Sequence, residues 1–356
     1  TIKFASLRTP TTYWQRLLKS GKINGIDDEM IFFRGLSVHL SVTILRYYRR
    51  PKTKGVSIMR SYRYCLILPV CTALFFSAVF ASQNCVGDDS FTLWQLPSQG
   101  PTQMMSYVIL TPEGKLIVLD GGMKCDAPYL REFIAARASE VELWIITHPH
   151  LDHMDALGVL FDTGTAPKIK KLFASFPELS WVKDHCSDGE YASFLAFSES
   201  LSQSGVLCED AQPDQKFKID RLEFHVLSVR NPELTRNPLN NSSLVIRVSD
   251  GVKSVLFLGD LGLEGGEKLL KSPLAESLPS EYVQMAHHGQ AGVGESFYQK
   301  VNPSYCLWTT PKWLWDNDRG EGPGTGPYKT LETRAWMDKL PIKKHYIMYE
   351  GLHEIN

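Results

Sequence analysis

Beyond residue 90 the chain alternates short apolar runs with polar turns, and most runs have the length of a β-strand. The runs at 107–110 and 116–119 are separated by Thr-Pro-Glu-Gly at 111–114, which predicts a β-hairpin. The run at 141–146 is almost wholly apolar and ends in a turn containing proline, as expected of a buried strand.

The same pattern continues toward the C-terminus. Helical spacing predicts helices at 127–138, 155–161, near 191–202 and at 329–340. Further strands are predicted at 217–229 as a hairpin, at 244–248 paired with 254–258, at 282–286 and at 344–349. Strands that alternate with helices favour an α/β fold.

The N-terminal part of the chain differs from this pattern. Residues 1–58 have a basic end and no clear periodicity, so this extension is expected to lie outside the translated or mature protein. Residues 59–81 combine a basic start, an apolar run at 66–80 and a small-x-small site, which is typical of a secretory signal peptide. The expectation is a secreted or envelope protein whose domain comprises 82–356. In the competing interpretation the leader stays uncleaved as a membrane anchor, the chain's only membrane contact.

Composition limits the classes of function. The chain has 356 residues, is 43% hydrophobic, and has a net charge of −1. Beyond the N-terminal region there is no dense run of lysine and arginine, which argues against a strong nucleic-acid-binding patch. The seven cysteines include no C-x-x-C, which argues against a cysteine zinc site, although Cys186 and Cys208 could pair in an exported protein.

One short motif concentrates the candidate chemistry. His148, His150, Asp152 and His153 lie within six residues, directly after the predicted strand at 141–146. Imidazole nitrogens and carboxylate oxygens are ligands for zinc and neighbouring metals. An exposed loop can also collect histidines by chance, but the strand before the motif and the helix after it favour a metal site at the strand's C-terminal end.

Two later segments extend this pattern. Gly259-Asp260 ends the predicted hairpin, and His287-His288-Gly289 follows the run at 282–286. Alone, the first is typical of a turn and the second of a surface loop. Each follows a predicted strand, as the histidine motif does, so each places candidate ligands at a strand's C-terminal end.

The H-x-H-x-D-H motif resembles that of the metallo-β-lactamase fold superfamily of metal-dependent hydrolases. The later segments Asn-Asn-Ser-Ser-Leu-Val (240–245), Leu-Gly-Asp (258–260) and Met-Ala-His-His-Gly (285–289) resemble ComEC-type competence hydrolases and bacterial phosphorylcholine esterases. The resemblance covers residue 91 to the end of the chain. It implies a single catalytic domain folded as an αββα sandwich.

The resemblance also implies a role for each residue of the motif. The first metal would be bound by His148 and His150, the second by Asp152 and His153, and Asp260 would bridge both. His288 would complete the second site. His287 would line the pocket as an acid or phosphate-stabilising group.

The chain departs from many members of this superfamily at one position. They supply another histidine between the motif and the bridging aspartate, where this chain offers only His185 and His225. His225 alternates with apolar neighbours in a predicted strand and could face solvent, and neither histidine is interpreted as a ligand. Solvent would then complete the first metal's coordination.

These expectations together predict a hydrolase that uses hydroxide bound by two divalent ions, with zinc preferred over manganese or iron. Asp152 and His287 are the candidate catalytic residues, and the resemblance favours a phosphodiester or other small-molecule substrate. A lactonase or other carboxyl-ester hydrolase is the first alternative. A non-catalytic metal- or nucleic-acid-binding module is the second, although structural zinc sites are normally closed sets of four ligands. The segment 310–327 could be a lid that presents Trp313 and Trp315 to substrate, or a packed surface loop.

Overall fold

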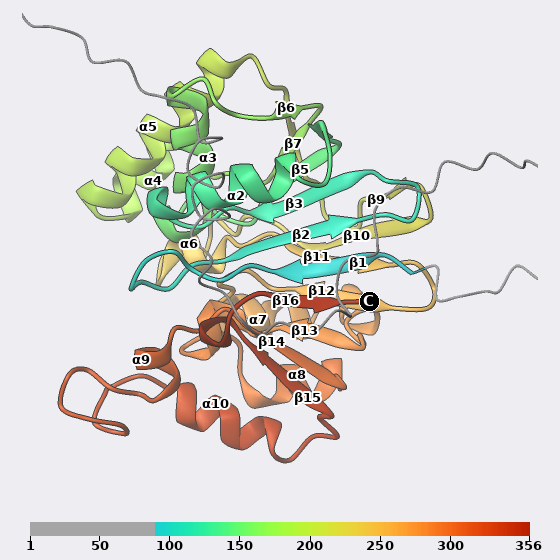
Figure 1. Ribbon diagram of the computed structural model, residues 1–356. Coiled ribbons are helices and arrows are strands. Elements are labelled where there is room, and N and C mark those ends of the chain that lie inside the picture. The colour runs from blue at the N-terminus through green and yellow to red at the C-terminus, as the bar shows by residue number, and fades with distance from the viewer. Residues whose placement is uncertain (1–89) are drawn as a thin grey trace, which may run out of the picture. The chain divides into compact units, whose positions relative to one another are not determined.

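Two seven-stranded sheets lie face to face in the computed structural model, and helices cover both outer faces (Figure 1). The structure describes residues 90–356, so the predicted leader and the extension before it lie outside the described residues. The α/β class and the αββα layering are confirmed. No helix within residues 90–356 is long and apolar enough to cross a membrane.

The first sheet contains the predicted hairpin and the strand before the histidine motif. Its strands are β1 (Thr92–Gln95), β2 (Ser106–Leu110), β3 (Leu116–Asp120), β5 (Leu143–Ile146), β7 (Leu172–Ala174), β8 (Cys208–Asp210) and β16 (His353–Ile355). They run in the order β16-β1-β2-β3-β5-β7-β8. β2 and β3 pair antiparallel, whereas β3, β5, β7 and β8 are parallel, so the carboxyl ends of these four strands meet at one edge.

The second sheet is built from the later part of the chain. Its strands are β9 (Lys216–Ile219), β10 (Leu222–Ser228), β11 (Val245–Ser249), β12 (Ser254–Phe257), β13 (Tyr282–Gln284), β14 (Tyr305–Trp308) and β15 (Lys344–Ile347). They follow one another in sequence order across the sheet. The strands from β12 to β15 are parallel, which again gathers their carboxyl ends at one edge. β4 (Glu140–Val141) and β6 (Lys168–Ile169) form a separate small sheet.

Helices segregate by sheet. Those packed on the first sheet are α2 (Ala127–Ala135), α3 (Leu151–Asp162), α4 (Leu179–His185) and α5 (Asp188–Ser204). Those on the second sheet are α7 (Leu263–Leu270), α8 (Glu295–Val301) and α10 (Thr330–Met337). Two single-turn helices, α6 (Pro238–Asn241) and α9 (Lys312–Trp315), lie in connections.

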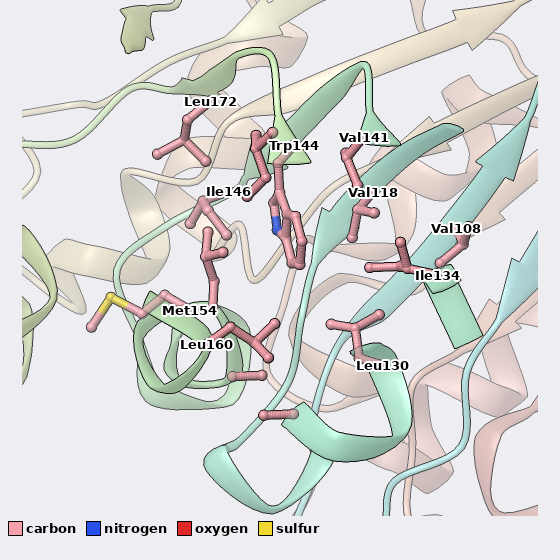
Figure 2. Packing of buried hydrophobic residues seen from close by; sticks show 14 of the residues in the cluster. Val108, Val118, Leu130, Ile134, Val141, Trp144, Ile146, Met154, Leu160 and Leu172 are labelled. Atoms are coloured by element: carbon pink, nitrogen blue, oxygen red, sulfur yellow. The ribbon is translucent and has the colours of Figure 1, made fainter. Parts of the chain in front are cut away.

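Buried apolar residues directly before and after the histidine motif hold it in place. Trp144 on β5 is fully buried and packs with Val118 and Leu130 (Figure 2). Ile146 before the motif and Met154 directly after it belong to the same cluster. Because close-packed interiors resist displacement, these contacts hold the intervening ligand segment in one position.

The structure corrects three expectations about elements. The helix after the motif begins at Leu151 rather than at 155, so Asp152 and His153 lie in its first turn and not on a loop. A carboxylate there is stabilised by the helix dipole. The strand predicted at 344–349 ends at Ile347, and a further strand, β16, pairs with β1 in the other sheet. The segment predicted to be a loop at 310–327 contains α9.

Candidate metal centre

The predicted site residues come together where strands of both sheets end. His148 and His150 follow β5 in the first sheet. Asp260 follows β12, and His288 lies in the short 3-10 turn η3 (Ala286–Gly289) after β13. The two halves of the chain therefore share one site.

A first group of ligand atoms comprises two histidines and an aspartate. His148 Nε2 lies 2.9 Å from His150 Nδ1 and 3.8 Å from Asp260 Oδ2. One atom from each of the three residues lies within 4.8 Å of the others, a separation suited to a shared metal ion.

A second group comprises Asp152, His153, His288 and the same Asp260. His153 Nε2 lies 3.2 Å from Asp260 Oδ1, and His288 Nε2 lies 3.1 Å from Asp152 Oδ2 and 3.4 Å from Asp260 Oδ2. Asp260 is thus common to both groups, as the resemblance to the superfamily implies for a bridging carboxylate.

Several of these atoms lack a hydrogen bond although they are buried. Within the part of the chain that the structure describes, His153 Nε2, His288 Nε2 and Asp260 Oδ1 have no hydrogen-bond partner. A buried polar atom without a partner is costly unless something else satisfies it. Because these atoms converge, a divalent cation fits the donor set.

The other ring nitrogens are held by hydrogen bonds, which fixes the nitrogen that faces the site. Asp120 Oδ2 lies 2.7 Å from His153 Nδ1, and Asp120 also accepts bonds from the backbone and the hydroxyl of Thr147. His288 Nδ1 lies 2.9 Å from the carbonyl oxygen of Thr309. Each contact orients an imidazole without adding a ligand.

Glu190 orients the imidazole of His150 in the same way. Its carboxylate lies 3.0 Å from His150 Nε2, and it also bonds the backbone and hydroxyl of Ser187 as the capping box of α5. Neither Asp120 nor Glu190 is among the site residues predicted from the sequence. The first could have been suspected because it ends a buried strand, and the second because Ser187 precedes it by three residues, the spacing of a capping box.

The backbone around the site is strained. Asp120, His287 and His288 all have positive φ angles, of 57°, 51° and 55°. Residues other than glycine rarely adopt this conformation, and it clusters at functional sites. In η3 the rings of the two successive left-handed residues lie 6.2 Å apart with an angle of 56° between their planes.

His287 lies beside both ligand groups and belongs to neither. Its Nε2 is 3.9 Å from Asp260 Oδ2 and 3.4 Å from Asn240 Nδ2, and its Nδ1 is 3.3 Å from the carbonyl oxygen of Ala291. Its side chain keeps 18% exposure, whereas that of His288 is fully buried. The structure therefore places His288 among the ligand atoms and His287 at the entrance.

Electrostatics keep the carboxylates of the site ionised. Burial opposes the charge on Asp260, but the imidazoles of His288 and His153 outweigh it and hold the pKa of Asp260 well below its usual range. Burial likewise opposes protonation of His288, yet Asp260 and Asp152 raise the pKa of His288 to about 9. For His148, burial together with neighbouring His153 depresses the pKa well below its ordinary value. The site concentrates negative charge as a cation site requires.

Neither of the two histidines between the motif and Asp260 reaches the site. His185 is exposed on α4, where it stacks on Trp181 and its Nδ1 lies 2.9 Å from the Trp181 carbonyl oxygen. His225 is 6% exposed, so the expectation that it could face solvent is wrong. The carboxylate of Asp214 lies 2.7 Å from His225 Nε2. The backbone N–H of Asp214 also donates to the carbonyl oxygen of Val226, which keeps Asp214 beside His225.

The segment 310–327 is expected to be either a lid or a packed surface loop. Trp315 packs edge-on against Trp308 and beneath the guanidinium of Arg334, as expected of a packed loop. Trp313 is half-buried and donates a hydrogen bond to the carbonyl oxygen of Pro101. Gln103, two residues further, donates to Asp152 Oδ2 at 3.1 Å, so this segment is tied to the loop that touches the site.

The predicted cysteine pair is not joined in the structure. Cys186 and Cys208 are both free thiols. Burial, with a nearby carboxylate, raises the pKa of each to about 11. Both thiols are therefore weakly nucleophilic at neutral pH.

A sandwich with two overlapping histidine–aspartate groups at its strand ends defines a class of metal-binding proteins. Residues 100–293, more than half of the chain, match the metallo-beta-lactamase superfamily, and the chain belongs to this superfamily. The ComE operon protein 3 of Bacillus subtilis (strain 168) is 27% identical over 177 residues, 49% of this chain and 21% of that protein. The predicted ComE-type resemblance is thereby confirmed, although the chain spans only about a fifth of this relative's length.

Several solved structures are similar to the chain at lower identity. The metallo-beta-lactamase fold protein YhfI from Bacillus subtilis is 12% identical, with a TM-score of 0.46, and the match covers 75% of this chain and 100% of that one. Unliganded yeast PDE1 is 12% identical with a TM-score of 0.47, covering 74% and 98%. A diphosphatase from the PhnP family is 13% identical with a TM-score of 0.42, covering 74% and 97%.

Proposed function

We propose that this protein is a hydrolase with two divalent metal ions and that it cleaves phosphodiesters. The observation that carries the proposal is Asp260, which is shared by two groups of converging ligand atoms. Two divalent ions bound there would supply a nucleophilic water of lowered pKa and would neutralise charge on a substrate oxygen. Zinc suits the imidazole-rich donor set best, with manganese or iron as alternatives.

Each ligand group has a different number of protein donors. His148, His150 and Asp260 would hold one ion, and this group of three leaves a coordination position for water or substrate. Asp152, His153, His288 and Asp260 would hold the other. The open first group argues against a purely structural metal module, because structural zinc sites are closed by four protein ligands.

His287 is the candidate for moving a proton. A carbonyl oxygen only accepts hydrogen bonds, so the contact with Ala291 places a proton on His287 Nδ1. His287 Nε2 then faces the site and can hold a second proton for the leaving oxygen. Its position at the entrance, rather than among the ligand atoms, brings this nitrogen to the substrate, which would replace the contact with Asn240 Nδ2.

The choice of a phosphodiester rests on the motifs at 240–245, 258–260 and 285–289, which resemble those of phosphorylcholine esterases. A lactonase or another carboxyl-ester hydrolase of the same fold is the second candidate. It is favoured by the same open first group, which could equally polarise a carbonyl oxygen.

A substrate panel distinguishes these functions. Purified protein with its metal content measured is tested on bis-p-nitrophenyl phosphate, p-nitrophenyl phosphorylcholine and lactones. Metal-dependent release of p-nitrophenol from the phosphodiesters, without lactone opening, supports the proposal. Lactone opening alone supports the alternative, and bound metal with no turnover of any substrate supports a non-catalytic module.

We also propose export, on the sequence of residues 59–81 alone. Expression from Met59 in a bacterial host should give a chain that begins near Ser82, as read by N-terminal sequencing. An uncleaved chain in the cytosol contradicts the signal peptide, and an uncleaved chain in the membrane supports the anchor.

A further inference from the structure

The site has a defined entrance. Of the seven residues at the site, three keep side-chain exposure: 21% for His150, 15% for Asp152 and 18% for His287. The side chains of the other four are exposed by 2% or less. A substrate therefore reaches the ligand atoms between the start of α3 and η3.

A cavity of about 410 Å³ opens on the α3 side of this entrance. Its lining includes His150, Leu151 and Asp152 from the motif and Ser187, Glu190 and Ser193 from the start of α5. We call it the α5 pocket. His287 is not part of its lining, so the candidate proton donor lies outside the α5 pocket.

The α5 pocket has no positive charge to offer an anion. None of the described residues that line it is a lysine or an arginine, and its one histidine, His150, is a candidate metal ligand. Its one charge outside the ligand set, on Glu190, is already engaged by His150 and Ser187. Leu151 adds an apolar wall, since its side chain is 41% exposed at the entrance. A second phosphate or a carboxylate would lose its hydration here without gaining a partner.

Its polar atoms are mainly hydrogen-bond acceptors. Ser193 Oγ donates its only proton to the Gly189 carbonyl oxygen, and Ser187 Oγ donates to Glu190. Both hydroxyl oxygens keep lone-pair capacity, so they can still accept bonds from a ligand. A ligand that supplies hydroxyl donors without charge therefore matches the lining.

We propose that the α5 pocket binds the retained ester arm of the substrate and that this arm is an uncharged polyol, such as a glyceryl or sugar group. The inference rests on the proposed phosphodiesterase function and adds its substrate class. The arm is the retained one because the leaving oxygen must lie near His287, outside the pocket. Chains with further phosphates next to the reacting one, such as polynucleotides, are poor substrates on this reasoning.

Three esters that share one leaving group test the proposal. The metal-loaded protein is assayed on the p-nitrophenyl phosphodiesters of methanol, of glycerol and of glycerol phosphate. We expect kcat/KM to be about 10-fold higher for the glyceryl than for the methyl ester, as two ordinary hydrogen bonds would provide. The phosphoglyceryl ester should fall below the glyceryl ester.

Variants connect this preference to the α5 pocket. Ser193→Trp should fill the pocket and bring the glyceryl-to-methyl ratio close to one, and Ser193→Ala should lower it to a smaller extent. Leu151→Lys should improve the phosphoglyceryl ester relative to the glyceryl ester. Leu207→Ala is the matched control, since Leu207 is 79% exposed beyond the far end of α5, and it should keep the wild-type ratios.

The outcomes separate the two proposals. If both Ser193 variants keep the glyceryl preference while retaining metal, the α5 pocket does not bind this arm. If p-nitrophenyl phosphorylcholine or the phosphoglyceryl ester is the best substrate of the wild type, the arm is charged and the inference is overturned. If no phosphodiester is cleaved by metal-loaded protein, the proposed function itself fails.

Discussion

At the scale of single residues, Asp260 has the largest influence because both ligand groups include it. It is buried between His153 and His288, so no neighbouring carboxylate can take its place without moving a strand end. Its loss would leave the first group with two histidines and the second with three donors. Two donors are too few to retain an ion tightly.

Asp260→Ala is therefore expected to lose the metal equivalent of the first group, to bind the second ion more weakly, and to lose nearly all activity, which elemental analysis and the substrate assay would measure. Asp184→Ala, at an exposed position on α4, is the control and should retain both. Full metal content together with full activity in Asp260→Ala would end the dinuclear interpretation.

Substitutions of His287 and of His288 should have different effects on metal content and on turnover. His288→Ala is expected to lose about one metal equivalent, because His288 Nε2 lies in the second ligand group. His287→Ala should keep both ions and turn over about 10²–10⁴-fold more slowly, the usual contribution of a general acid. The loss should be smallest for p-nitrophenyl esters, whose leaving group needs little protonation. Metal loss from His287→Ala instead would reverse the two roles.

Asp120 is predicted to act through His153. Asp120→Asn keeps the size of the side chain but removes the negative charge that faces His153 Nδ1. Metal affinity, measured by competition with a chelator, should fall about 10–100-fold. Rescue of activity at high metal concentration would support positioning, whereas unchanged affinity would show that Asp120 only stabilises the turn.

The sequence indicated the ligands but not the residues that orient them. His148, His150 and His153 share one short motif, so their spacing alone signals chemistry. Asp120 and Glu190 lie 27 residues before Thr147 and 40 residues after His150, and reach them only because β3 pairs with β5 and because α5 starts beside the motif. No local pattern encodes those two arrangements.

At the scale of elements, hairpins were predictable because alternating apolar residues and glycine-containing turns specify them locally. β16 was not, since three residues gain strand geometry only by pairing with β1, more than 250 positions away. The start of α3 was also misplaced. The turn that begins with Pro149 resembles a loop, yet the His150 carbonyl oxygen already accepts bonds from His153 and Met154.

The tight turn at Gly289, after the histidine pair, should be sensitive to substitution. Gly289 has φ +78°, and a Cβ there would lie 2.4 Å from the ring of buried Trp308. Gly114 is a matched control with φ +86° and open space around it. Alanine at 114 should cost about 1–2 kcal/mol for the left-handed conformation. Alanine at 289 should cost about 1–3 kcal/mol more through overpacking.

Urea denaturation of the metal-free variants would measure both free energies of unfolding. Equal losses at the two positions would show that Trp308 moves aside at no cost, and the close packing around η3 would then not constrain the turn.

At the scale of the whole molecule, each sheet supplies part of the site, so bound metal should stabilise the entire domain. One ion at about 100 times its dissociation constant would add about 2.7 kcal/mol. For a domain of this size that corresponds to a rise in Tm of roughly 5–10 °C. Thermal unfolding with and without chelator would measure the difference.

Asp260→Ala serves as the comparison for this measurement, because a protein that has lost the shared ligand should show a smaller change in Tm when the chelator is added. A wild-type Tm that does not respond to the chelator would contradict binding at the junction of the two sheets. The overall α/β class was predictable from the order of strands and helices, but the way in which the sheets face each other depends on the long-range packing between them.

The division of the ligands between distant parts of the chain also affects how the protein acquires metal during its synthesis. His153 is made 135 residues before His288, and Asp260 lies between them. A growing chain therefore presents the histidine motif first as an unsupported peptide, which would favour ions in the general affinity order of divalent metals, with copper ahead of zinc. Only after Asp260 and His288 have been added can the geometry of the site select among metal ions. The identity of the metal is thus decided by the finished domain and not by the histidine motif alone.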